Sequence, residues 1–382
     1  MDKYVPKKMK KINKIAVLTV AIMLVLTACT NGSKSPNNNQ GNTEGTFKNI
    51  MFVVTGTLGG RTNNDDVLLA IDDYVKTVDG KVDTFECNMD TSLYESTLMQ
   101  AAETGEYDLI VTGFGTMIEP LGNTAKKYPN QKFLIFDTKM DYSNGANSNV
   151  ISVQVLQNEG GFLAGALAAE LTTSNAELAN KEKVVGFVGA IESTSVLDFL
   201  MGYIDGVNYV DPSIEVLYSF VGNHTDSALA KELGLSQYQQ GADVVFAVGQ
   251  NGLGVAEAAS AANKYVIGVD FDYSERLAVT SKEDAAHVLT SVIKDYRGMV
   301  YPILEGINKG EVEWGTHTFI SHAEGGVYLV NNDYTKAIVQ SDVSSKYDKI
   351  VEELNSGKIK VSTAFGASTE EIEKVKSEAK SH

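Results

Sequence analysis

The sequence predicts an α/β protein built from two lobes of similar architecture. From Asn49 onward, short β-rich runs alternate with helix-length segments, which is typical of parallel sheets with helical crossovers. This pattern pauses near residue 155 and restarts near residue 184. The chain has 382 residues, whereas single hydrophobic cores stop growing at about 250 to 300 residues. Two lobes are therefore expected.

The expected elements follow from composition and from the spacing of apolar residues. In the first block, strands are expected at 50–55, 81–86, 109–112, 132–136 and 150–153, with helices at 65–78, 92–104 and 116–128. In the second block, strands are expected at 184–188, 215–220, 244–248 and 266–269, with helices at 195–210, 227–240 and 252–262. A helix rich in Ala and Gly, 156–170, joins the blocks, and its small residues would let its backbone approach a sheet closely.

The remaining elements are too few for a third domain. A strand at 287–293, a helix at 296–309 and strands near 316–320 and 327–330 should complete the two sheets, so the chain would pass between the lobes more than once. We expect an N-terminal lobe at 47–155, completed by about 272–312, and a C-terminal lobe at 156–271, completed by about 313–382. A cleft between the lobes would lie at the carboxyl ends of the strands, where open α/β sheets bind ligands.

The N-terminus has the pattern of an export signal. Six lysines before residue 15 precede an apolar run at 15–26, which is shorter than the roughly 20 residues of a membrane span. The run ends in Leu26-Thr27-Ala28-Cys29, which resembles the lipobox of bacterial lipoproteins. We expect a signal peptide at 1–28, lipid attachment at Cys29 and a flexible polar tether at 29–46. An ordinary cleavable signal with an incidental cysteine is the alternative.

Charge and cysteine content restrict the partners. Without residues 1–29 the chain keeps 26 basic and 48 acidic residues, a net charge of −22. Such a surface repels nucleic acid and anionic lipid. Cys87 is then the only cysteine apart from Cys29, so no disulfide can form within one mature chain, and a packed thiol is expected. The histidines lack metal-ligand spacing, so no metal or cofactor is expected, and Trp314 is interpreted as a packing or hinge residue.

Several stretches, taken in order, resemble a known family. They are 149–153, 159–165, 183–189, 239–246, 252–257, 265–270, 288–294 and 324–327. Together they are similar to the basic membrane protein family of substrate-binding lipoproteins, whose characterised relatives include purine nucleoside receptors of ABC importers. The resemblance implies a type I periplasmic-binding-protein fold, in which two Rossmann-like lobes joined by three crossings close on a ligand at a hinge. It also implies an ABC permease and its ATPase as partners, and we expect a monomer.

The resemblance also implies ligand-binding residues. Asp137, after a strand, matches an aspartate that binds the ribose, and Lys294 matches a lysine that reaches a ribose hydroxyl. Asp270 is placed in the same way after a strand of the second lobe, where we expect it to bind a sugar hydroxyl. Turn caps for the aspartates and a solvated charge for the lysine are the alternatives. If the three converge, the ammonium would hold both carboxylates as acceptors for vicinal hydroxyls.

Four further residues are candidates on weaker grounds. Phe199 matches a phenylalanine that stacks on the base, Gly249 lies in a glycine-rich turn whose N–H groups could approach a ligand, and Asn64 and Asp65 could contact the ring edge. Core packing, helix packing and loop capping are their respective alternatives. In the first loop, the family's other stacking phenylalanine falls on Asn63, which removes stacking of the order of 1 kcal/mol. The resemblance therefore leaves the identity of the base open.

Three functions are compatible with these features. The favoured one is a lipid-anchored receptor on the extracytoplasmic face of the cell membrane that binds a nucleoside or similar sugar-bearing solute for an ABC importer. A nucleoside hydrolase acting in the same cleft is the enzyme alternative, although no Gly-x-Ser-x-Gly elbow or zinc signature is present. A ligand-sensing surface receptor is the third.

Overall fold

The computed structural model describes residues 46–60 and 62–381. The expected signal peptide, Cys29, the tether up to residue 45 and Arg61 lie outside these residues. Within the described ranges, none of the helices combines the length and apolar character that a membrane span requires. Cys87 is buried and not disulfide-bonded, and burial raises the pKa of its thiol.

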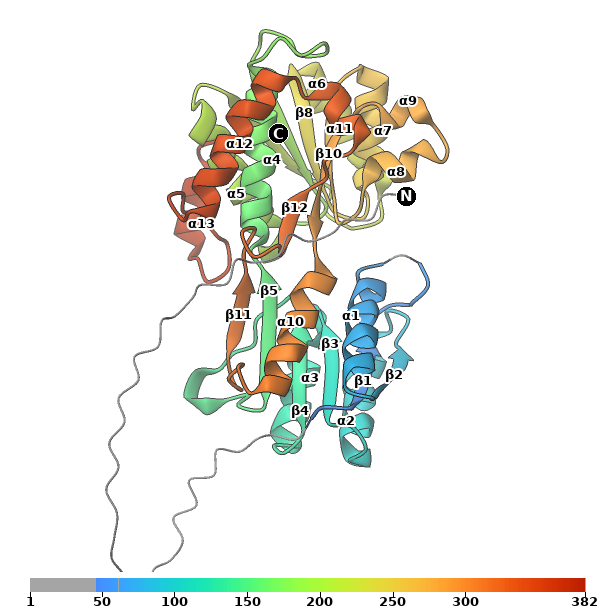
Figure 1. The fold of residues 1–382 in the computed structure, drawn as a ribbon. Coiled ribbons are helices and arrows are strands. Elements are labelled where there is room, and N and C mark those ends of the chain that lie inside the picture. The colour runs from blue at the N-terminus through green and yellow to red at the C-terminus, as the bar shows by residue number, and fades with distance from the viewer. Residues whose placement is uncertain (1–45, 61, 382) are drawn as a thin grey trace, which may run out of the picture. The chain divides into compact units, whose positions relative to one another are not determined.

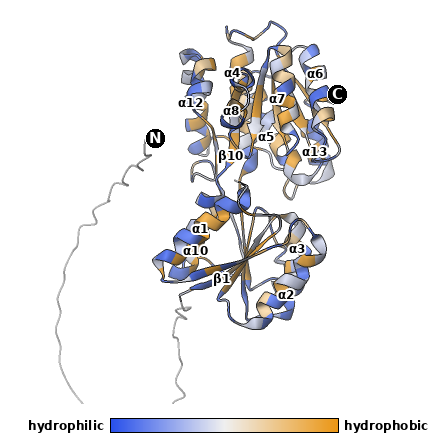
Figure 2. Ribbon diagram, turned by 90° about the vertical axis from the view of Figure 1, so that its right-hand side faces the viewer, coloured by the Kyte–Doolittle hydropathy of each residue, from blue (hydrophilic) through white to orange (hydrophobic). Residues whose placement is uncertain are grey.

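The first sheet contains six strands, all paired in parallel, in the order β11-β5-β4-β3-β1-β2. These strands are β1 (Asn49–Val54), β2 (Lys81–Glu86), β3 (Leu109–Gly113), β4 (Lys132–Phe136), β5 (Val150–Val155) and β11 (His317–Ile320). One face is covered by α1 (Asn63–Thr77) and α10 (Tyr296–Lys309), the other by α2 (Tyr94–Thr104) and α3 (Ile118–Lys127), as Figure 2 shows. The buried strands are apolar because both faces carry helices.

The second sheet follows the order β12-β10-β9-β8-β6-β7-β13, and only β12 is antiparallel to its neighbour. Its strands are β6 (Val184–Gly189), β7 (Glu215–Phe220), β8 (Ala242–Val248), β9 (Tyr265–Val269), β10 (Val288–Lys294), β12 (Val327–Leu329) and β13 (Lys380–Ser381). Helices α4 (Gln157–Thr172) and α5 (Thr194–Val210) cover one face, and α6 (Ser227–Gln239) and α7 (Gly252–Ala262) the other.

Further helices complete both lobes. They are η1 (Thr91–Leu93), η2 (Gly115–Met117), η3 (Ser143–Gly145), α8 (Tyr273–Ala278), α9 (Lys282–Ala285), α11 (Asp333–Ile338), α12 (Ser341–Asn355) and α13 (Thr369–Lys376). Helix α12 packs on α4 and α13 on α5 (Figure 1). At the carboxyl ends of the strands, side chains cap the helices that follow: Ser193 accepts a hydrogen bond from the Val196 N–H, and Asp295 from the Gly298 N–H.

The chain crosses between the sheets three times, as the resemblance implies. The crossings are β5 to α4, β10 to α10, and β11 to β12. Their allocation differs from the expected boundaries, because β10 belongs to the second sheet and β11 to the first. The reason is the backbone pairing: β10 pairs with β9 through residues such as Ser291 and Gly268, and β11 with β5 through His317 and Ser152. Linear order along the chain does not encode this partnering.

The glycines of α4 serve two contacts. Gly160 faces the sheet as expected, because a Cβ there would lie 2.6 Å from Val327 of β12 and 2.7 Å from Val292 of β10. Gly161 and Gly165 instead face the backbone of α5: a Cβ on Gly161 would lie 2.3 Å from the Phe199 carbonyl oxygen, and one on Gly165 would lie 2.1 Å from that of Tyr203. Gly202 and Gly206 of α5 make the reciprocal approach to α4. The two helices are therefore packed backbone against backbone.

Candidate solute-binding site

Two aspartates occupy equivalent places in the two sheets. Asp137 directly follows β4 and Asp270 directly follows β9, and the N–H of each donates to a carbonyl of the next strand, Val153 at 2.8 Å and Val292 at 2.9 Å. Both have left-handed backbones, with φ of 55° and 69°. Residues other than glycine rarely adopt this backbone conformation. It costs roughly 1 to 3 kcal/mol and persists only where the surrounding structure stabilises it. Both carboxylates are thereby fixed at the carboxyl edges of their sheets.

Lys294, the last residue of β10, joins the first of these carboxylates. Its Nζ lies 2.9 Å from Asp137 Oδ2, and the two side chains are only 7% and 9% exposed. The hydroxyl of Tyr296 donates to the same oxygen at 2.8 Å. Both donors, Lys294 and Tyr296, lie at the second crossing between the sheets. This crossing therefore positions the carboxylate of Asp137 in the first lobe.

Asp270 shares the electrostatic environment of this pair. Burial raises the pKa of Asp270, with Lys294 opposing the rise and Asp137 adding to it. For Lys294, burial alone would lower the pKa, but Asp137 and Asp270 outweigh it, so the pKa is raised. Lys294 is therefore a charged ammonium facing two carboxyl groups, one from each lobe. The structure brings these three predicted residues together.

Each of the two carboxylates keeps one oxygen that the protein leaves unpaired. Asp137 Oδ1 and Asp270 Oδ1 are buried and have no hydrogen-bond partner within the described part of the chain. An unpaired buried acceptor costs about 1 to 3 kcal/mol, and more when it is charged. The arrangement can thus accept two hydrogen bonds from a hydroxylated ligand.

Asn64 and Asp65 behave differently at the start of α1. Asn64 is buried, and its Oδ1 has no partner in the described residues, so it remains a candidate for a ligand contact. Both oxygens of Asp65 are engaged in its own loop, accepting from the N–H groups of Gly59 at 2.6 Å and Thr62 at 2.7 Å. Burial alone would raise the pKa of Asp65, but these hydrogen bonds lower it. The geometry favours the loop-capping alternative for Asp65.

Phe199 and Gly249 show mainly packing contacts. The Phe199 ring is 3% exposed and meets Phe246 edge-on, with centroids 5.9 Å apart. Gly249 has a φ of 138°, and a Cβ there would lie 2.4 Å from the Cβ of Ala190. Backbone conformation and packing therefore suffice to explain the glycine.

Tyr296 is a site residue that the sequence reasoning missed. The pattern identified it only as the first residue of a helix, although its position two residues after Lys294 was an available signal. Its ring is 1% exposed and lies edge-on to Phe136 at 6.1 Å. Burial raises the pKa of Tyr296 well above its usual range, with Asn63, the residue at the position of the family's stacking aromatic, opposing the rise.

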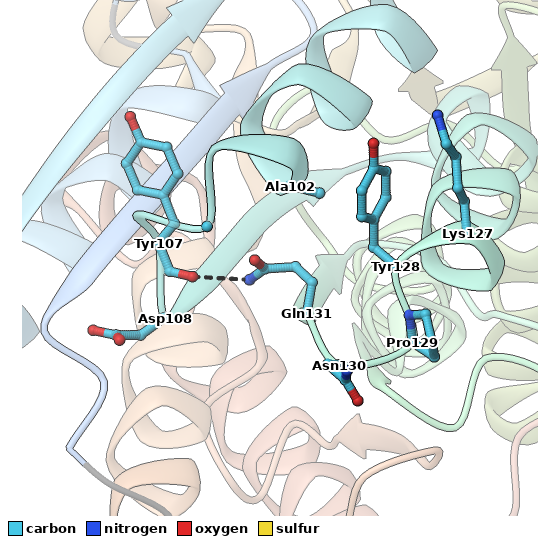
Figure 3. A pocket seen from close by; sticks show the side chains of 9 residues that line it. Ala102, Tyr107, Asp108, Lys127, Tyr128, Pro129, Asn130 and Gln131 are labelled. Atoms are coloured by element: carbon cyan, nitrogen blue, oxygen red, sulfur yellow. Dashed lines mark hydrogen bonds between the residues drawn. The ribbon is translucent and has the colours of Figure 1, made fainter.

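Four cavities are lined by residues other than Asp137, Asp270 and Lys294. Figure 3 shows one of about 500 Å³, lined by residues of the loops that precede β3 and β4, including Tyr107, Tyr128 and Gln131. Because it lies at the amino ends of these strands, it is on the opposite edge of the sheet from Asp137. Three other cavities of about 520 to 590 Å³ are likewise lined by other residues than Asp137, Asp270 and Lys294.

The fold and the polar cluster define a class. Two parallel α/β lobes with three crossings, and charged side chains from the carboxyl edges of both sheets, make this a solute-binding protein with the type I periplasmic-binding-protein fold. The chain belongs to the Bmp family, because residues 47–363 match the family of ABC transporter substrate-binding proteins described as PnrA-like.

Individual relatives agree with this assignment. The chain is 27% identical over 356 residues to the ABC transporter nucleoside-binding protein BmpA of Lactococcus lactis subsp. cremoris, covering 89% of this chain and 97% of the relative. It is 30% identical over 217 residues to basic membrane protein D of Borreliella burgdorferi, covering 56% and 59%. Among solved structures, a solute-binding protein of an ABC transporter system from Aeropyrum pernix K1 superposes with a TM-score of 0.70 at 21% identity, covering 87% and 98%. The last likeness concerns the fold alone.

Proposed function

We propose that this substrate-binding protein captures a nucleoside or a similar small sugar-bearing solute on the extracytoplasmic face of the membrane and delivers it to an ABC permease driven by its ATPase. The family supports the transport role, and the name of the Lactococcus relative supports the nucleoside. In this proposal residues 1–28 are removed, a lipid on Cys29 anchors the protein, residues 29–46 form the tether, and the protein acts as a monomer.

The observation on which the proposal depends is the pair of unpaired carboxylate oxygens. Asp137 Oδ1 and Asp270 Oδ1 are buried acceptors, and the Nζ of Lys294 lies 2.9 Å from the other oxygen of Asp137. Adjacent hydroxyls of a ribose are donors that could satisfy one acceptor from each lobe. Binding would then draw the lobes together, because the solute would bridge the two sheets.

The charge of the cluster supports an uncharged solute. One ammonium faces two carboxyl groups, and the chain as a whole is strongly acidic. A phosphate added to the solute would be desolvated near excess negative charge, which is unfavourable. The proposal is therefore a nucleoside and not a nucleotide.

The same geometry supports capture without chemical conversion. Asp137 is occupied by Lys294 and Tyr296 through one oxygen, an arrangement that fixes an acceptor and does not prepare a nucleophile or a proton donor. We accordingly propose a binding protein, not an enzyme.

Calorimetric titration of the purified protein tests the proposal. The panel is adenosine, guanosine, inosine, uridine, free ribose and AMP, and we expect at least one nucleoside to bind while AMP does not. An Asp270→Asn variant should lose most of that affinity. Absence of heat across all four nucleosides would reject the nucleoside assignment, and release of free base on prolonged incubation, followed by chromatography, would reject the non-enzymatic role. Fractionation of cells carrying Cys29→Ser tests the anchor, which predicts release from the membrane.

A further inference from the structure

The hydrogen bonds around Asp137 reveal a role for a residue outside the predicted set. We infer that Tyr296 is a positioning residue of the solute site, which fixes Asp137 so that its Oδ1 alone is presented to the ligand. This inference rests on the proposed function, because it concerns how the same site selects hydroxyl groups.

The first step is the occupancy of Asp137 Oδ2. Lys294 Nζ donates to this oxygen at 2.9 Å and Tyr296 OH donates at 2.8 Å. A carboxylate oxygen has two lone pairs, so both acceptor positions of Oδ2 are filled. Lys294 supplies the charge, while the second donor prevents the carboxylate from rotating about its own axis. Only Oδ1 can then accept a hydrogen bond from the ligand, and this oxygen is buried and unpaired in the described chain.

The second step is the immobility of the phenol itself. The Tyr296 ring is held edge-on against Phe136 at 6.1 Å and tilted against Phe114 at 6.3 Å. Burial, together with Asp137 and Asp270, raises the pKa of Tyr296 well above its usual range. The hydroxyl therefore keeps its proton and donates a hydrogen bond to Asp137. Because this hydrogen bond commits the hydroxyl to Asp137 Oδ2, Tyr296 acts through Asp137 rather than on the ligand.

Lys294 and Tyr296 are both positioned by one short segment of the chain, the turn between β10 and α10. Lys294 and Tyr296 flank Asp295, whose carboxylate caps α10 by accepting from the Gly298 N–H at 2.7 Å. The second crossing therefore carries both donors as one rigid turn. Phe114 and Phe136 support the phenol from the first lobe. Asp137 is thus oriented before any solute arrives, which lowers the entropic cost of binding.

Because Asp137 Oδ1 is a fixed hydrogen-bond acceptor, the site should select ligands that carry a hydroxyl group at this position. A site built to accept a hydrogen bond from a hydroxyl discriminates strongly against an analogue that lacks it, since the buried acceptor is then left unpaired. If the Asp137 carboxylate could rotate, Oδ1 could accept a hydrogen bond from another protein group or from water. Binding of the deoxy analogue would then leave no unpaired acceptor, and the difference in affinity would decrease. Tyr296 should therefore affect discrimination as well as affinity.

The test compares Tyr296→Phe with Tyr301→Phe, a matched control on the same helix whose hydroxyl contacts only Glu305, at 3.4 Å, among its hydrogen bonds in the described structure. The full-length protein is titrated calorimetrically with adenosine, 2′-deoxyadenosine and 3′-deoxyadenosine, and with the inosine series if adenosine does not bind. For Tyr296→Phe we expect Kd for the ribonucleoside to rise about tenfold, and the preference over the more weakly bound deoxy analogue to fall by a similar factor. Tyr301→Phe should match the wild type in both.

A second variant, Phe114→Leu, provides an independent check, because it removes one of the two rings that hold the phenol without touching Asp137. It should reduce the same preference, by less than Tyr296→Phe does. Wild-type affinity and preference in both variants would overturn the inference while leaving the proposed function intact. An equal loss of affinity for all three nucleosides would also overturn it, since that pattern indicates only a structural role. Failure of the wild type to bind any nucleoside would instead reject the proposed function.

Discussion

The contact between α4 and α5 allows a quantitative prediction for Gly165→Ala. The Cβ of the new residue would lie 2.1 Å from the Tyr203 carbonyl oxygen, whereas ordinary contact begins at 3.4 Å. The obstacle is helix backbone, which cannot turn away as a side chain can. The helices would therefore have to separate locally by about 1.3 Å, the difference between these two distances.

Two effects of opposite sign set the magnitude. Overpacking of a well-packed interior costs typically 1 to 3 kcal/mol, and this contact is at the upper end because backbone must move. Replacing Gly by Ala within a helix recovers about 1 kcal/mol through helix propensity. We expect the free energy of unfolding to fall by about 2 kcal/mol. A control is Gly122→Ala in α3, where the nearest atoms to the new Cβ would be 3.8 Å away. It should be neutral or stabilising by up to about 1 kcal/mol.

Urea unfolding followed by circular dichroism measures both variants. The midpoint for Gly165→Ala should lie clearly below that of the wild type, and the midpoint for Gly122→Ala at or above it. If Gly165→Ala proved as stable as Gly122→Ala, the close backbone packing of α4 and α5 would be refuted.

Two further predictions concern buried charges. Lys294→Met should abolish nucleoside binding and lower the free energy of unfolding by about 3 to 5 kcal/mol, because it leaves Asp137 buried without its ion partner. The control, Lys309→Met, removes an exposed ion pair and should lower the free energy of unfolding by at most about 1 kcal/mol, measured by urea unfolding. Equal losses of stability in the two variants would contradict the reasoning. Burial raises the pKa of Asp198 from 3.8 to about 6, with hydrogen bonds from Thr363 and nearby N–H groups opposing it. The folded state therefore binds more protons than the unfolded state between these values, so this group adds about 1 kcal/mol of stability as the pH falls from 7 to 5. Unfolding of the wild type and Asp198→Asn at both pH values should show that gain only in the wild type, and the same gain in both would disprove the assignment.

Most of the fold could be predicted from the sequence because its information is local. Strands 81–86 and 132–136 were located to the residue. The strand at 132–136 is a short, buried apolar run, and the strand at 81–86, an exposed edge strand, alternates polar and apolar residues. Some helix starts were displaced: the helix expected from Asp65 begins at Asn63, and the one expected from Ser92 begins as a 3-10 turn at Thr91. Those ends depend on capping contacts that periodicity does not show.

The candidate site was predicted in part for the same reason. Asp137, Asp270 and Lys294 directly follow or end strands, so their positions at the carboxyl edges of the two sheets could be inferred from parallel topology. Tyr296 could not, because its role comes from a hydroxyl that meets Asp137 at a sequence separation of 159 residues. The unpaired oxygens of Asp137 and Asp270 could not be predicted either, because hydrogen bonding depends on which groups are neighbours in three dimensions.

By itself, then, the sequence determined the order and type of the elements, the tandem α/β plan and the strand-end charges, all of which are written in short-range patterns of polarity. Only the tertiary structure decided which sheet β10 and β11 join, that Gly161 and Gly165 of α4 face α5, and that Tyr296 and Lys294 share one oxygen of Asp137. Each of these is a pairing between residues distant in the chain, and its stability depends on geometry and burial that no local pattern specifies.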